Sequence, residues 1–183
     1  MNKYVILPGC DDGNRGDQAL VWETVKIAKQ SGFDGKYYML CAPEDMLHST
    51  KEDIQGLSPI LAHPGRKSSG IDNQKYGLKL ILSWGMVAAK DYIMSKLILW
   101  KFTRSLLLKY LSPEIRNTVK IIQDCDACFV KGGGFLHSYG SLTEIYQIYF
   151  FLYHILLAQS LGKKVYIMPN PFGPFIAPTV KYQ

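Results

Sequence analysis

Four short apolar runs, each closed by glycine or proline, constrain the fold of this chain more than any other feature. They are KYVIL from Lys3, KYYMLCAP from Lys36, ACFVKGGG from Ala127 and KKVYIMPN from Lys163. Runs of this length without polar alternation are typical of strands buried on both faces of a parallel sheet. Helical patterns fill the intervals. The sequence therefore predicts a Rossmann-like, three-layer α/β/α fold with a mostly parallel sheet.

Size and charge bound the organisation of the chain. It has 183 residues, 48% of them apolar, which is enough to bury the core of one domain. The net charge is +6, and eleven Lys or Arg residues face only three acids between Ala62 and Lys120. The basic character thus belongs to the middle of the chain. We expect residues 1–183 to form a single domain with a basic, helical insertion at about 71–111.

The stretch ILPGCDDGNRGDQAL, from Ile6, leaves the first strand and enters a helix. Asp17 is placed to cap this helix, and Gly32 is placed to end it. The residues expected near one face of the helix are Leu20, Thr24, Ile27 and Ala28. Lys3 to Cys41 is therefore predicted to form one βαβ unit.

The middle of the chain is predicted to be loops and then helices. Residues 43–70 are polar and rich in Pro and Gly, which indicates loops with at most one short helix. Helices are expected from Asn73 to Leu111, with an interruption near Gly85. The next helix has Ser112 as its N-cap and Pro113 in its first position.

The last helix is expected to begin at a capping box formed by Ser141 and Glu144. It contains the longest stretch without formal charge, IYQIYFFLYHILLAQSLG from Ile145. Gly162 and two lysines lead from it directly into a strand, which indicates a buried crossover helix rather than a membrane span. No secretory signal follows Met1, and this favours a cytoplasmic protein.

Cys125 and Cys128 form a C-x-x-C pattern, which raises the question of a zinc or redox site. No second Cys/His pair is present to complete a tetrahedral zinc site, and the motif runs into a strand instead of starting a helix. Two small buried residues are the better interpretation. We predict no metal site.

Three glycine-bearing loops follow strands of the predicted sheet: PGCDDGNRGD, KGGGFLHS and PNPFGP. Ligands of such sheets bind outside the carboxyl ends of the strands, so these loops are expected to converge on one crevice. Successive glycines there serve either packing or the close approach of a ligand. Arg15 and His137 are either anion-binding side chains or plain surface residues. Asp11 and Asp12 are either free carboxylates or solvated turn residues.

Signatures of nucleotide-dependent enzymes are missing. Gly9, Gly13 and Gly16 lack the spacing of G-x-G-x-x-G, and no G-x-x-x-x-G-K-[ST] motif occurs. H-E-x-x-H and G-x-S-x-G motifs are also absent. The sequence therefore predicts no cofactor.

Three stretches in this order, GNRGDQAL, DACFVKGGGFL and AQSLGKKVYIMPNPFGP, resemble the polysaccharide pyruvyl transferase family. The resemblance covers most of the chain and is weakest from Lys51 to Leu111. It implies an enzyme that moves the enolpyruvyl unit of phosphoenolpyruvate onto sugar hydroxyls, usually as a ketal, in the synthesis of surface polysaccharide. It also implies two Rossmann-like halves similar to GT-B glycosyltransferases. By this resemblance the chain is an amino-terminal half whose carboxy-terminal domain is absent.

The resemblance also implies a set of site residues. Those expected to bind substrate are Asn14, Arg15, Gly16, Gly132, Gly133, Gly134, His137, Asn170 and Gly173. Asp17 or Asp12 is the implied catalytic base, which takes the proton of the acceptor hydroxyl. The implied partners are phosphoenolpyruvate and a saccharide acceptor.

Two other functions stay open. One is a GT-B-type glycosyltransferase that uses a sugar nucleotide, because a fold does not select a donor. The other is a non-catalytic Rossmann-like binding module. No nucleic acid partner is predicted, because the basic segment lacks a recognition motif.

The basic, apolar segment from Leu78 to Leu111 suggests additional partners. These are the inner face of the membrane, a second copy of the chain or the missing domain. From Lys90 to Lys109 the charges spread over more than half of a helical wheel. This spread favours two or three packed helices over a single membrane-surface helix.

Overall fold

The computed structural model describes residues 1–8, 13–41, 45–46, 53–61, 78–137 and 142–176. Its strands are β1 (Lys3–Leu7), β2 (Lys36–Met39), β3 (Ile54–Gly56), β4 (Ala127–Val130) and β5 (Lys164–Ile167). Its helices are α1 (Arg15–Gln30), α3 (Leu78–Leu99), α4 (Lys101–Leu107), α5 (Pro113–Asp124) and α6 (Leu142–Ser160). The α/β class predicted from the sequence is confirmed.

The five strands form one sheet in the order β3-β2-β1-β4-β5, and every pairing is parallel. Strand β1 lies at the centre, where Val5 pairs with Tyr38 of β2 on one side and with Cys128 of β4 on the other. The strand order reverses direction between β1 and β4. Such a reversal is the point at which parallel α/β sheets open a crevice at their carboxyl edge.

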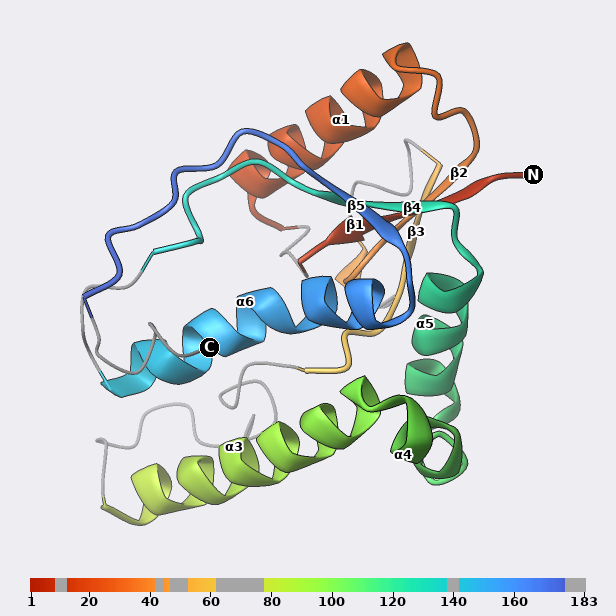
Figure 1. Ribbon diagram of the computed structural model, residues 1–183. Helices are drawn as coiled ribbons and strands as arrows, with labels where there is room; N and C mark the ends of the chain where they lie inside the picture. Colours follow the sequence, from red (N-terminus) through yellow and green to blue (C-terminus); the bar gives the residue numbers. More distant parts are fainter. Residues whose placement is uncertain (9–12, 42–44, 47–52, 62–77, 138–141, 177–183) are drawn as a thin grey trace.

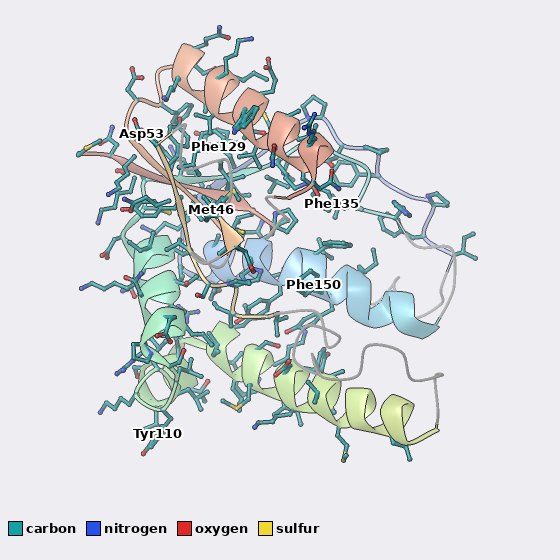
Figure 2. The ribbon with its side chains drawn as sticks, turned by 180° about the vertical axis from the view of Figure 1, so that it is seen from behind. Met46, Asp53, Tyr110, Phe129, Phe135 and Phe150 are labelled. Atoms are coloured by element: carbon teal, nitrogen blue, oxygen red, sulfur yellow. The ribbon has the colours of Figure 1, made fainter. Side chains whose placement is uncertain are left out.

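Side chains of β1 alternate between two cores, as the period of a strand requires. Tyr4 and Ile6 pack with Val21 and Val25 of α1 on one face of the sheet. The alternate residues of β1 pack against α5 and α6 on the other face, in a cluster that includes Val5, Leu7, Val119, Ile122, Tyr153 and Leu157. Figure 1 shows α1 alone on its side of the sheet and α5 and α6 on the other. In Figure 2, Phe129 of β4 lies between the sheet and α1.

The start of α1 differs from the prediction. Asn14, not Asp17, is the N-cap, and its side-chain oxygen accepts from the N–H groups of Gly16 at 2.9 Å and Asp17 at 3.5 Å. Asn14 has the extended backbone that an N-cap needs, with φ −86° and ψ 112°. Asp17 lies inside the first turn, where a carboxylate interacts favourably with the helix dipole. Gly32 adopts φ +87° just beyond the helix, as its predicted role at the end of α1 requires.

Helices α3 and α4 form a further layer outside α6 (Figure 1). The predicted interruption near Gly85 is wrong, because α3 continues through it. A helical glycine costs only about 1 kcal/mol, which tertiary packing easily offsets. The break falls at Trp100, whose backbone is extended. Buried Arg104 of α4 stabilises this bend, since its guanidinium donates to Ile98 O at 2.7 Å, Leu99 O at 2.8 Å and Ser160 Oγ at 2.7 Å.

Strand β3 differs from the prediction, which placed only loops and at most one short helix in residues 43–70. It has three residues, too few for an alternating pattern, and its pairing partner β2 defines it. The N-cap Ser112 of α5 is confirmed, with its hydroxyl accepting from Ile115 N. Ser141 of the predicted capping box lies outside the described residues.

Two further structural predictions are confirmed. Cys125 and Cys128 are buried, with their sulfur atoms 3.6 Å apart. The uncharged stretch near the end of the chain belongs to α6, in which Tyr153, Leu157 and Ala158 are fully buried. Among the helices of the described ranges, none combines the length and apolarity needed to cross a bilayer.

Candidate functional site

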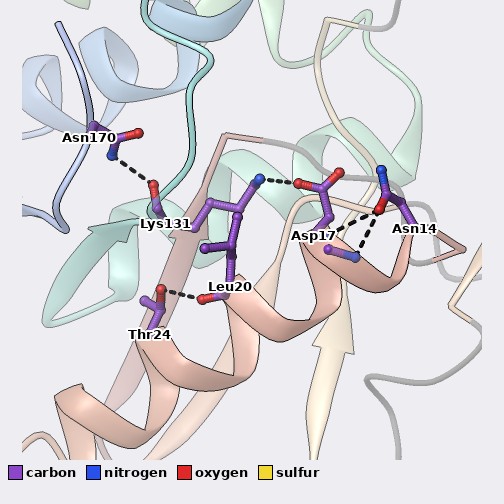
Figure 3. A network of polar contacts seen from close by, with 7 residues as sticks. Asn14, Asp17, Leu20, Thr24, Lys131 and Asn170 are labelled. Atoms are coloured by element: carbon purple, nitrogen blue, oxygen red, sulfur yellow. Dashed lines mark hydrogen bonds and ion pairs between the residues drawn. The ribbon is translucent and has the colours of Figure 1, made fainter.

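The candidate site lies at the carboxyl edge of the sheet, where the strand order reverses between β1 and β4. The amino-terminal end of α1 and the segments after β4 and β5 meet there (Figure 3). Two backbone hydrogen bonds fix this arrangement. Lys131 N donates to Leu7 O at 2.8 Å, and Met168 N donates to Val130 O at 3.0 Å. The expected convergence is therefore confirmed for the described parts of the three loops.

An ion pair between Lys131 and Asp17 is the centre of the site. The ammonium of Lys131, just after β4, donates to Asp17 Oδ1 in the first turn of α1 (Figure 3). The Lys131 side chain is only 6% exposed, whereas that of Asp17 is 27% exposed. A buried ammonium requires such a partner, because desolvation without one costs several kcal/mol. Lys131 Nζ also lies 5.5 Å from the centre of the Phe135 ring, within cation–π range.

Asn170 connects the loop after β5 to this pair. Its side-chain amide donates to Lys131 O at 2.9 Å and to Met168 O at 3.0 Å. Its other polar atom, Oδ1, is buried and accepts no hydrogen bond from the described residues. An unmatched buried acceptor costs about 1–3 kcal/mol.

Close packing of the protein itself explains two of the three glycines after β4. A Cβ on Gly132 would lie 3.2 Å from Pro169 O, and one on Gly133 would lie 3.0 Å from a methyl carbon of Leu20. Gly133 also has φ +122°, which side chains rarely tolerate. Gly134 differs, because its Cβ would meet only Pro171, at an ordinary 3.7 Å.

The other predicted residues lie around this centre. Gly173, with φ +93°, donates its N–H to Leu136 O at 2.9 Å. This hydrogen bond joins the loop after β5 to the loop after β4. Arg15 and Gly16 are exposed at the start of α1, together with the capping residue Asn14. His137 is partly buried on the segment that follows β4. Asp12 lies outside the described residues.

Lys131 is the residue that the sequence reasoning undervalued. It was not among the predicted site residues, yet the structure makes it the partner of the predicted catalytic residue Asp17. Its position directly after a fully apolar strand could have identified it. A lysine at such a position is buried, and a buried cation needs an anion beside it.

The hollows found at the described surface lie elsewhere. Two hollows of about 400 and 520 Å³ share Lys29 and Ile54 in their linings and lie by the β3 edge of the sheet, away from the ion pair. Within the described ranges, no three His, Cys, Asp or Glu side chains gather as metal ligands would.

Comparisons with models of known families, with curated proteins and with solved structures found no match for this chain.

Proposed function

We propose that this chain is a pyruvyl transferase of surface polysaccharide synthesis, which transfers the enolpyruvyl unit of phosphoenolpyruvate to hydroxyls of a sugar to form a ketal. One observation carries the proposal: the motifs that resemble the pyruvyl transferase family meet at one edge of the sheet around Asp17 and Lys131. In this proposal the domain is one half of a GT-B-like enzyme. The ion pair lines its side of the cleft between the halves.

The reaction needs an acid and a base that face each other. Protonation of the methylene carbon of phosphoenolpyruvate leaves an oxocarbenium-like centre, which a sugar hydroxyl attacks. Phosphate then leaves, and a second hydroxyl closes the ketal. The proton of the first hydroxyl replaces the proton that the methylene carbon took up, and the proton of the second hydroxyl leaves with phosphate. Atoms and charge balance without a redox partner.

The chain's residues have the following roles in this proposal. Asp17 accepts the proton of the attacking hydroxyl, and Lys131 fixes the orientation of its carboxylate. The exposed guanidinium of Arg15, at the start of α1, binds an anionic group of the donor.

The test compares donors and then variants, with the full-length product of the gene. We expect phosphoenolpyruvate, and not sugar nucleotides, to raise the melting temperature, and an acceptor saccharide to release phosphate and yield a ketal methyl signal by NMR. Asp17→Asn should lower turnover at least about a hundredfold. Glu23→Gln on the same helix is the control, because Glu23 forms only an exposed ion pair with Lys26.

Two results would contradict the proposal. A melting shift with sugar nucleotides alone would indicate the glycosyltransferase. Normal ketal formation by a folded variant carrying both Asp17→Asn and Asp12→Asn would refute the assigned bases.

A further inference from the structure

The outer surface of α3 carries an apolar stripe that no described part of the chain covers. Leu82, Met86, Ile93 and Trp100 are 59%, 70%, 59% and 66% exposed. Leu82, Met86 and Ile93 follow one another at four and seven residues, which places them on one side of α3, and Trp100 lies at the bend just beyond this helix. On the opposite side, Ile98 is buried in the core. The exposed side of α3 is thus rich in large apolar side chains.

A second set of exposed apolar residues follows the bend at Trp100. Phe102, Leu106 and Tyr110 follow one another at four-residue intervals and are 91%, 58% and 80% exposed. Figure 2 shows Tyr110 pointing away from the rest of the molecule, at the end that carries α3 and α4. We call the seven residues of the two sets the α3–α4 surface. Exposed aromatic and aliphatic residues in such number indicate a binding surface.

The charges near this surface indicate the class of partner. From Leu78 to Leu111 the chain holds six Lys or Arg residues and one acid, Asp91, a net charge of +5. Arg104 is buried, and Lys96 packs against the rings of Tyr92 and Tyr149. Three lysines are exposed in the same segment: Lys90, Lys101 and Lys109.

A second copy of the chain would fit this surface poorly. In a two-fold dimer the same patch meets itself, so two patches of the same positive charge would face each other. Cores of protein interfaces are also depleted in lysine. Trp and Tyr beside lysine, on helices that do not span, are typical of the boundary between lipid headgroups and acyl chains.

We propose that the α3–α4 surface docks on an anionic lipid bilayer, with Trp100 and Phe102 entering the headgroup boundary and Lys90, Lys101 and Lys109 facing the lipid phosphates. The helices lie on the membrane and do not cross it. This proposal does not depend on pyruvyl transfer, because it uses neither Asp17 nor Lys131.

Co-sedimentation with vesicles tests the docking. We expect binding to phosphatidylcholine vesicles that contain roughly 30% phosphatidylglycerol, weaker binding to pure phosphatidylcholine, and loss of binding in about 0.5 M salt. Lys101→Gln with Lys109→Gln should weaken binding about fivefold for each lysine. Ile93→Ser with Phe102→Ser should weaken it at least about tenfold. These side chains are exposed, so melting temperatures should stay unchanged.

The matched control is Trp22→Ser with Ile27→Ser. Both residues are 39% exposed and lie on α1, on the other side of the sheet. The proposal is refuted if these variants weaken binding as much as those of the α3–α4 surface, or if anionic vesicles bind no protein. It is also refuted if Ile93→Ser with Phe102→Ser converts a stable dimer into monomers without affecting vesicle binding, since the surface would then join two copies of the chain.

Discussion

Removing one charge of the Lys131–Asp17 pair should destabilise the protein by an amount that depends on which charge is removed. Asp17→Asn leaves an ammonium whose side chain is 6% exposed without its anion. Breaking a buried pair in this way costs about 3–5 kcal/mol. We expect about 3 kcal/mol, the lower limit, because the Phe135 ring 5.5 Å away still attracts the cation.

Lys131→Met should cost less, about 1 kcal/mol, because the remaining carboxylate is 27% exposed and lies in the first turn of α1. The double variant has no buried charge, and the Met side chain occupies the space of the lysine stem. It should also lose only about 1 kcal/mol. The two substitutions are therefore strongly non-additive, with a coupling energy of about 3 kcal/mol.

Urea unfolding followed by circular dichroism measures these free energies. With an unchanged m-value, the single Asp17→Asn loss corresponds to a melting temperature lower by about 6–12 °C for a chain of this size. Glu23→Gln, which removes a surface pair whose side chains are 57% and 63% exposed, should stay within about 0.5 kcal/mol of the parent. Additive effects of Asp17→Asn and Lys131→Met would show that the Lys131 ammonium is hydrated and would refute the burial argument. A loss below about 1 kcal/mol for Asp17→Asn would do the same.

Three further predictions use the same assay. Asn14→Ala should cost about 1 kcal/mol through loss of the α1 cap, and Asn14→Ser should restore most of it. Gly133→Ala should cost about 2 kcal/mol because of its positive φ and the clash with Leu20, whereas an equal cost for Gly134→Ala would contradict this reason. Burial lowers the pKa of His154 to about 3, and its Nε2 accepts from Ile60 N at 3.1 Å. The unfolded chain therefore binds a proton that the folded chain excludes, so stability should fall by about 2 kcal/mol from about pH 6.5 to pH 5, and His154→Gln should flatten this dependence.

The sequence predicted the local structure well where burial leaves a recognisable pattern of apolar residues. The apolar runs at Lys3, Lys36 and Ala127 became buried parallel strands, as expected. The run at Lys163 became β5 at the edge of the sheet, where Tyr166 and Ile167 are 39% and 50% exposed, so the expected burial is wrong for this strand. Strands buried on both faces must be apolar throughout, so they are visible without a partner. The α5 start at Ser112 and Pro113 was equally visible, because a cap acts within one turn.

Local rules failed where two candidates could meet the same requirement. Asn14 and Asp17 are both good caps, and only the path of the chain out of β1 decides which has the extended backbone of the cap. Gly85 was a plausible break, but packing of α3 against α6 kept the helix continuous. The short strand β3 exists only because β2 lies beside it.

The sequence by itself determined four of the five strands, the helices apart from the break at Trp100, and the loops that follow these four strands. These properties depend on neighbours a few residues away. Only the tertiary structure decided that β4 lies next to β1. That pairing brings Lys131 to Asp17 across 114 residues of chain. Burial of the lysine makes the contact obligatory. No local pattern records it, since the energy of a desolvated charge depends on what surrounds it in space and not on its neighbours in sequence.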